Sequence, residues 1–296
     1  MERGMSGAAL HSGYVNVAGL RLHHTHGGAG TPPVLFIHGL GSSGYIEWRF
    51  NLAVAARRHR VFAPDLPGFG RSEKPAARYG IPFFARTLER YMESRNLESA
   101  AVVGTSLGGR IALEVALRYP ERVERLVLVN ALGLGRPQVQ LYYGLVMLPR
   151  VGEAFMRVAR EALHRAPPRM IRRVAGRYIG MSADLDRTMD DSYLADLREM
   201  YSAEGYPSAY LSTVRSLVTP RALAGSHDLS ARLHKIAAPV LLIWGADDPL
   251  FPLEHATRAH RLLPGSKLAV IDGAGHTPQA ERPDEFNRVL GRFLAS

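Results

Sequence analysis

The sequence predicts an α/β fold in which helices flank a mostly parallel sheet and a long helical insertion interrupts it. Short apolar runs at 34–37, 101–103, 126–129 and 240–244 are typical of strands buried on both faces. Helical patterns alternate with these runs, which indicates βαβ units and parallel strands. Between 130 and 240 the sequence has no further apolar runs typical of strands, and apolar residues recur at helical spacing instead. This stretch is the predicted insertion.

Composition limits the class of protein and its chemistry. The chain has 296 residues, of which 46% are hydrophobic and 22% charged, as in a soluble globular protein with a sizeable core. Because it has no cysteine, disulfides, thiolate metal sites and a cysteine nucleophile are excluded. The first twenty residues contain no apolar signal-like run, and the stretch 141–148 is too short to span a bilayer. We expect a cytoplasmic protein.

The first predicted elements are two strands, 14–17 and 20–26, which form an antiparallel hairpin at the sheet edge. The second strand carries His23, His24 and His26. His24 and His26 share a strand face, so a metal pair is one interpretation. An exposed edge strand explains the same residues, and we expect no metal site.

The segment Gly104-Thr105-Ser106-Leu107-Gly108-Gly109 follows the strand 101–103 and opens a helix. A serine held in such a sharp strand-to-helix turn needs neighbours without side chains, so that its Oγ can project outward. The helix N-terminus beneath it favours developing negative charge. The sequence therefore indicates a nucleophilic serine, Ser106, although a glycine-rich turn with an incidental serine is the alternative.

The helix after this turn, 107–119, has charges only at Arg110, Glu114 and Arg118. These residues are four apart and make one narrow polar stripe. The helix is therefore predicted to be largely buried, and Pro120 ends it.

A serine nucleophile needs a base and an acid that orients the base. The strand 240–244 leads into Gly245-Ala246-Asp247-Asp248-Pro249, and the strand 268–271 leads into Gly273-Ala274-Gly275-His276. The chain order of serine, aspartate and histidine is that of α/β-hydrolases.

With these motifs, residues 14–133 and 234–296 resemble the core of the α/β-hydrolase fold family, in particular serine hydrolases of the carboxylesterase and lipase type. Residues 134–233 resemble that family's variable helical lid, or cap. The resemblance implies an eight-stranded sheet. Three further segments match the family: His38-Gly39-Leu40-Gly41, Asp65-Leu66-Pro67-Gly68-Phe69-Gly70-Arg71-Ser72 and Ala280-Glu281-Arg282-Pro283.

The resemblance also implies roles for residues of this chain. Ser106 would be the nucleophile and His276 the general base, with the backbone N–H groups of Leu40 and Leu107 as the oxyanion hole. The family pattern of glycine, two residues and aspartate selects Asp248 as the acid.

Two alternatives for the acid are less favourable. Asp247 is adjacent to the selected residue but out of register with the pattern. Some relatives take the acid from the loop after the sixth strand, where this chain has Asn130, which cannot hold the charge of an imidazolium.

The implied reaction is hydrolysis of a small-molecule carboxylic ester or other acyl substrate through an acyl-enzyme, without a cofactor. Thioester hydrolysis is the next interpretation. Carbon–carbon bond hydrolases of ring-cleavage pathways also resemble the Ser106 turn and 129–135. They usually place tryptophan where this chain has Thr277, and a glycine- and proline-rich loop where it has Ser42 and Ser43.

Two interpretations belong to other functional classes. Gly39, Gly41 and Gly44 form a G-x-G-x-x-G pattern with Asp65 about twenty residues on, as in NAD-binding oxidoreductases. That interpretation leaves the serine turn and the histidine loop unexplained. The alternative role for Asp65, together with Ser72, is to stabilise a turn. The second interpretation is a non-catalytic ligand receptor with the same fold, because fold does not imply function.

The net charge of +10 is unevenly distributed. Residues 136–177 hold nine Arg and two Glu, whereas 178–204 hold seven acidic residues and two Arg. Pairing between these halves is one interpretation, and a surface for an anionic membrane or acyl carrier is the other. We expect no nucleic-acid partner. The arginines that would face such a partner are Arg157, Arg160, Arg172 and Arg173.

The insertion also contains candidate substrate-binding residues. They line an acyl pocket or form the packing between insertion helices. These residues are Tyr142, Tyr143, Met147, Phe155 and Met156.

Overall fold

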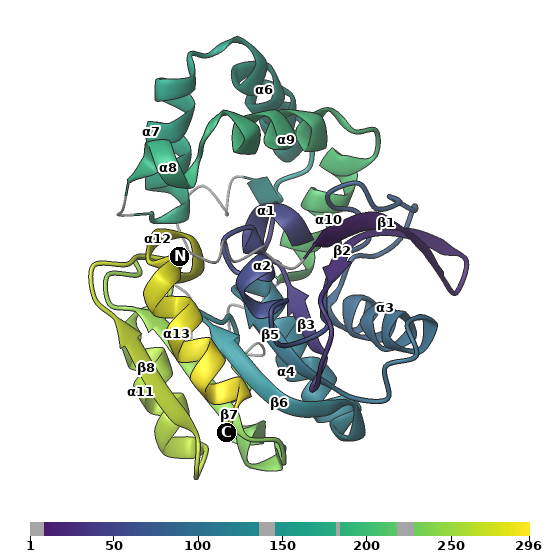
Figure 1. Cartoon of the computed structure of the whole chain (residues 1–296). Helices are drawn as coiled ribbons and strands as arrows, with labels where there is room; N and C mark the ends of the chain where they lie inside the picture. The colour runs from purple at the N-terminus through teal and green to yellow at the C-terminus, as the bar shows by residue number, and fades with distance from the viewer. Residues whose placement is uncertain (1–8, 136–145, 182–183, 218–227) are drawn as a thin grey trace, which may run out of the picture.

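The computed structural model describes residues 9–135, 146–181, 184–217 and 228–296 (Figure 1). Its centre is one eight-stranded sheet with the order β1-β2-β4-β3-β5-β6-β7-β8. The pairs β1·β2 and β2·β4 are antiparallel, and the other neighbours are parallel. The strands are β1 (Leu10–Val17), β2 (Leu20–Gly27), β3 (Val34–Ile37), β4 (Val61–Pro64), β5 (Ala100–Thr105), β6 (Val123–Val129), β7 (Val240–Gly245) and β8 (Lys267–Ile271). The predicted mostly parallel sheet is confirmed.

Helices cover both faces of this sheet and bury its apolar runs. In β3, Leu35 and Ile37 belong to one hydrophobic cluster and Val34 and Phe36 to the other, because successive strand residues point to opposite faces. The first cluster includes residues of α3 (Ile81–Ser94), α4 (Leu107–Arg118) and α11 (Leu253–Leu262). The second includes residues at α1 (Gly44–Trp48), α2 (Leu52–Ala55) and α13 (Pro283–Leu294).

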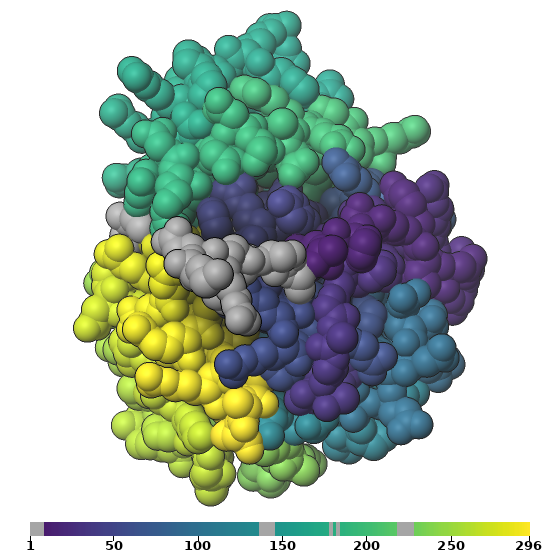
Figure 2. Space-filling model, viewed as in Figure 1, coloured from purple at the N-terminus to yellow at the C-terminus, as the bar shows by residue number. Residues whose placement is uncertain are grey.

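A segment of helices connects β6 to β7 and lies over one end of the sheet (Figures 1 and 2). We call its described residues, 146–181 and 184–217, the helical segment; they contain no strand. Its helices are α6 (Val151–Arg165), α7 (Pro168–Ile179), α8 (Leu185–Thr188), α9 (Asp191–Ser202) and α10 (Tyr206–Leu217). In the part of the chain that the structure describes, no helix combines the length and apolarity needed to cross a bilayer.

Helix α4 is buried as its charge stripe predicts. Arg110 and Glu114 are both buried and lie 3.0 Å apart, and Arg118 also pairs with Glu114. One carboxylate therefore pairs with two guanidinium groups along a single helix stripe.

The histidines of β2 do not lie on an exposed edge strand, so that expectation is wrong. The edge strand is β1, whereas β2 pairs on both sides, and His23 and His24 are buried. His24 Nδ1 lies 2.6 Å from the hydroxyl of Tyr91. Among the described residues no cluster of three His, Asp or Glu has an arrangement that holds a metal ion.

Candidate active site

Ser106 lies at the junction of β5 and α4, where it is the N-cap residue of the helix. Its φ of 52° and ψ of −118° put a non-glycine residue in a strained region of backbone space. The flanking glycines make this turn possible. A Cβ on Gly104 would lie 2.3 Å from the carbonyl oxygen of Gly108, and a Cβ on Gly108 would lie 2.3 Å from that of Ile37.

The structure brings His276 and Asp248 together although 28 residues separate them. His276 Nδ1 lies 2.9 Å from Asp248 Oδ2, and both residues are buried. The ring of Phe251 packs edge-on against the imidazole, with a centroid distance of 5.2 Å. The imidazole therefore contacts both a carboxylate and an aromatic ring.

Asp248 is ionised in this environment. Burial disfavours its charge, but the charge of His276 and hydrogen bonds from His276, Asn130 and the Leu250 backbone outweigh that effect. The pKa of Asp248 is consequently below its ordinary value. Its Oδ1 accepts from the N–H groups of Leu250, at 2.8 Å, and Phe251, at 3.1 Å.

Asn130 is a site residue whose role the sequence did not predict. It has a φ of 40° and is fully buried at the end of β6. Its Nδ2 donates to Asp248 Oδ2 and, at 3.3 Å, to the carbonyl of Gly275. Its Oδ1 accepts from the N–H of Gly245 at 3.0 Å. One amide thus ties the aspartate loop to the histidine loop.

Ser106 and His276 line the same cavity, whose volume is about 90 Å³. Leu40 lines it as well, and Leu107 is the first residue of α4. The predicted oxyanion donors therefore belong to a cavity-lining loop and to the N-terminal turn of the helix behind Ser106.

The helical segment completes this cavity with residues that differ from those expected. Met181, Thr188 and Tyr193 line it. Met147 and Phe155 are not among its lining residues and instead pack against the hydrophobic core. Met156 is buried in the hydrophobic core and does not line the cavity either. The remaining candidates, Tyr142 and Tyr143, lie outside the described residues.

The predicted family segments shape the loops around the cavity. Burial lowers the pKa of His38, so its neutral ring donates from Nδ1 to the carbonyl of Gly39 at 2.7 Å. Its Nε2 accepts from the N–H of Leu66 at 2.9 Å. Glu281 accepts from the N–H groups of Gly275 and Thr277, at 3.1 and 3.0 Å, on either side of His276.

Asp65 braces a loop and is not a ribose-binding acid. Its carboxylate accepts from the N–H groups of Gly44 and Arg71, both at 2.8 Å, and contacts His23 Nδ1 at 3.0 Å. A Cβ on Gly44 would lie 2.3 Å from the carbonyl oxygen of Ala63, so close packing explains this glycine. The turn-stabilising interpretation of Asp65 is confirmed.

A larger cavity, of about 450 Å³, adjoins this one at Ile46, which lines both. It is lined by His23, Asp65, Arg71 and Glu199 among others. Neither Ser106 nor His276 lines it. Its charged groups already pair with one another, since Arg71 contacts Glu199 at 3.0 Å. We therefore assign the chemistry to the smaller cavity.

Comparisons with known sequences identify the family of the chain. The family model described as "alpha/beta hydrolase fold" matches residues 32–283. The 2-hydroxymuconate semialdehyde hydrolase of Pseudomonas sp. strain CF600 is 30% identical over 283 residues, which cover 94% of this chain and 92% of that protein. The 2-hydroxy-6-oxononadienedioate/2-hydroxy-6-oxononatrienedioate hydrolase of Paraburkholderia phymatum is 32% identical. The match covers 97% of this chain and 96% of that protein.

A solved structure gives the same relationship. A meta-cleavage product hydrolase from Pseudomonas fluorescens IP01 superposes with a TM-score of 0.75 and 26% identity, covering 96% of this chain and 97% of that one.

Proposed function

Because the chain belongs to the alpha/beta hydrolase fold family, we propose that it is a serine hydrolase that works through an acyl-enzyme on Ser106. The observation that carries this proposal is the buried pair of His276 and Asp248, which opens into the same cavity as the strained Ser106 turn.

The chemistry follows from these groups. His276 takes the proton of Ser106 as the serine oxygen attacks a carbonyl carbon, and the N–H groups of Leu40 and Leu107 stabilise the resulting oxyanion. When the tetrahedral species collapses, the bond to the leaving group breaks and the leaving group takes the proton from His276. Water, activated by the same imidazole, then releases the acyl group and regenerates Ser106. Asp248 holds the ring and stabilises its positive form throughout.

The first candidate substrate is a vinylogous diketone, in which the enzyme would cleave a carbon–carbon bond next to a carbonyl. The support comes from relatives that are 30–32% identical over nearly the whole chain and whose names describe hydrolases of such ring-cleavage products. In this case the leaving group is a carbanion stabilised by the conjugated keto acid, and the proton from His276 is added to carbon. This order reverses the preference for esters that the sequence motifs alone suggested.

A carboxylic ester is the second candidate, and Thr277 favours it. Thr277 lines the cavity at the position where the carbon–carbon bond hydrolases usually have tryptophan. Its hydroxyl donates to Glu281 at 3.1 Å, so a small, fixed side chain replaces a large aromatic ring beside the base. With an ester, the leaving group is an alkoxide that accepts the same proton.

The proposed nucleophile is tested by labelling with a fluorophosphonate probe. Wild-type protein is expected to be labelled and Ser106→Ala to remain unlabelled and to lose turnover by at least about a thousandfold. Ser42→Ala is the matched control, because Ser42 lines the same cavity, and we expect it to label normally. Labelling of the Ser106→Ala protein at the wild-type rate would refute the proposal.

The bond that is cleaved is tested with a substrate panel. It contains a vinylogous diketone acid, nitrophenyl esters of rising chain length and an acyl thioester. If kcat/KM is highest for the diketone, the first substrate class is supported. If kcat/KM is highest for an ester or a thioester, that class takes its place.

A further inference from the structure

We propose that the outward faces of α6 and α7 form a docking surface for an anionic lipid membrane. We call this surface the outer face; it consists of Val151, Val158, Met170 and Val174 together with Arg157, Arg160, Arg169, Arg173 and Arg177. The proposal concerns binding and does not depend on which bond the enzyme cleaves.

The apolar part of the outer face is unusually exposed for side chains of this kind. Val158 is 66% exposed, and Met170 and Val174 are each 59% exposed. Met170 and Val174 are four residues apart and therefore neighbours on one side of α7. The side of α7 that packs inward carries Ile171 and Gly176, which are buried. Exposed methyl and thioether groups of this size favour transfer out of water.

The cationic part of the outer face has no charged partner among the residues that the structure describes. All five arginines are exposed, and in the described part of the chain none of them forms an ion pair or a side-chain hydrogen bond. Arg173 and Arg177 lie beside Val174 at helical spacings of one and three residues, so charge and apolar surface are interleaved. Long arginine side chains can contact lipid phosphates while the shorter apolar groups enter the interface.

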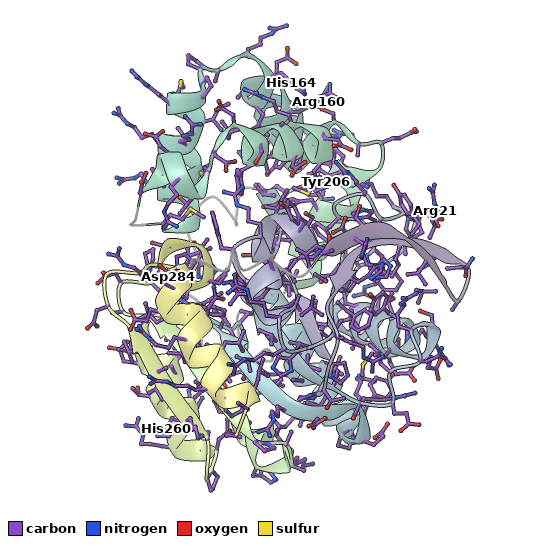
Figure 3. All side chains as sticks on the ribbon, in the orientation of Figure 1. Arg21, Arg160, His164, Tyr206, His260 and Asp284 are labelled. Carbon is purple, nitrogen blue, oxygen red and sulfur yellow. The ribbon has the colours of Figure 1, made fainter. Side chains whose placement is uncertain are left out.

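The location on the molecule suits a flat partner. The helices α6 and α7 form the end of the molecule that is farthest from α11 and the lower end of the sheet (Figure 1), and their side chains protrude there in the space-filling view (Figure 2). Arg160 and His164 lie at this end (Figure 3). An acidic carrier protein would match the charge but would leave the exposed valines and Met170 unexplained, which is why a membrane fits better.

Docking there would place the membrane close to the cavity. Helix α7 ends at Gly180, whose carbonyl accepts from the N–H of His276 at 3.1 Å. The next residue, Met181, lines the cavity. A Cβ on Gly180 would lie 2.5 Å from Pro249, so the end of α7 packs directly on the histidine and aspartate loops.

The test is co-sedimentation with vesicles at low salt. Wild-type protein is expected to bind vesicles of phosphatidylcholine with about 30 mol% phosphatidylglycerol, to bind pure phosphatidylcholine far more weakly, and to be released by about 0.5 M NaCl. Because a basic protein binds anionic vesicles through net charge alone, the variants must be matched in charge. The triple variant Arg169→Gln, Arg173→Gln, Arg177→Gln removes three charges from α7. The control Arg261→Gln, Arg288→Gln, Arg292→Gln removes three exposed charges from α11 and α13.

Each arginine at an anionic surface contributes roughly fivefold to the partition coefficient, so the α7 variant is expected to bind about a hundredfold more weakly and the control within threefold of wild type. A second pair separates the apolar contribution: Met170→Gln with Val174→Thr is expected to weaken binding severalfold, and the exposed Leu262→Gln with Val270→Thr is expected not to. Three outcomes would overturn the proposal. They are equal losses of binding in both charge variants, no loss of binding in the Met170 and Val174 variant, and binding of an acidic protein without binding of vesicles. Circular dichroism of each variant checks that the helices are intact.

Discussion

Asn130 joins three loops of the site through one side chain. The sequence places it after a strand, where some relatives carry the catalytic acid, but its bonding to Asp248 and Gly275 depends on residues 118 and 145 positions away. No local pattern predicts such a contact. Ser106, His276 and Asp248, by contrast, each follow a recognisable strand-and-glycine motif, and the structure pairs the last two as expected.

Replacing Asn130 tests whether it positions the acid. Asn130→Ala removes a donor to an ionised carboxylate, an interaction of about 1.5–3 kcal/mol, so kcat/KM is expected to fall roughly 10- to 100-fold. The pKa of Asp248 should rise, because a hydrogen bond that lowers it is lost. The acid limb of the kcat/KM profile should therefore move to higher pH.

The control for this variant is Asn287→Ala on α13. It removes hydrogen bonds to the Phe50 carbonyl and to Asn51, so it should lower stability without moving the pH profile. If both variants leave the profile unmoved, Asn130 has only a structural role.

His24 makes stability depend on pH. Burial, with added repulsion from His26 and Arg95, lowers its pKa from 6.5 to about 4. Between these values the unfolded chain binds a proton at His24 and the folded chain does not, so the free energy of unfolding decreases as pH falls from 6.5 towards 4. His24→Gln should reduce this slope by at most about 1.4 kcal/mol per pH unit.

Urea unfolding at several pH values measures the slope. His26 and His38 also have lowered pKa values, so part of the slope should survive in the variant. Thr25→Val, at the neighbouring buried position of β2, changes no titratable group and should leave the slope unchanged. A wild-type slope in the His24→Gln protein would contradict the prediction.

At the scale of elements, the apolar runs predicted the central strands because burial on both faces leaves a continuous apolar signal. The run at 34–37 coincides with β3, and the other runs extend by one to three residues to their observed ends. The strand β4 is only four residues long and ends in proline, and no apolar run in the sequence predicted it. The cavity lining by Met181, Thr188 and Tyr193 was missed, since it depends on how separate helices pack on the core.

The close approach of α4 to β3 gives a prediction at this scale. In Gly108→Ala, the new Cβ would lie 2.3 Å from the Ile37 carbonyl oxygen and 2.6 Å from that of His38. Neither strand nor helix can yield easily, so stability should fall by about 1–3 kcal/mol or more.

The matched control is another helical glycine, Gly291 of α13, around which nothing lies within 4 Å of a new Cβ. Gly291→Ala should stabilise the protein by about 0.5–1 kcal/mol through helix propensity. Urea midpoints compare the two variants. An unchanged stability in Gly108→Ala would show that the turn at Ser106 is not tightly packed.

At the scale of the whole molecule, the charged residues of the helical segment fall into those that pair with other residues and those that are exposed. Arg172 pairs with Asp186 and Asp191, which is the pairing between the two halves that one interpretation of the sequence predicted. Other acids of α9 and its N-cap instead contact arginines of the α/β core: Asp190 pairs with Arg49, and Asp196 and Glu199 pair with Arg71. Three acids of the helical segment therefore pair with arginines of the α/β core, whereas the five arginines of the outer face are exposed.

These contacts predict which arginine holds the helical segment on the core. The Arg49 side chain is only 8% exposed and donates to the Thr188 carbonyl at 2.6 Å, whereas Arg71 is 48% exposed and pairs with Glu199 in solvent. Arg49→Gln should cost about 1.5–3 kcal/mol, because a buried acceptor loses a charged donor. Arg71→Gln should cost about 1 kcal/mol or less, and salt should screen that contribution. Urea unfolding at 0.05 and 0.5 M NaCl separates the two, and limited proteolysis should cut the helical segment first in the Arg49→Gln protein. Equal costs for both variants would mean that apolar packing, and not Arg49, fixes the segment above Ser106.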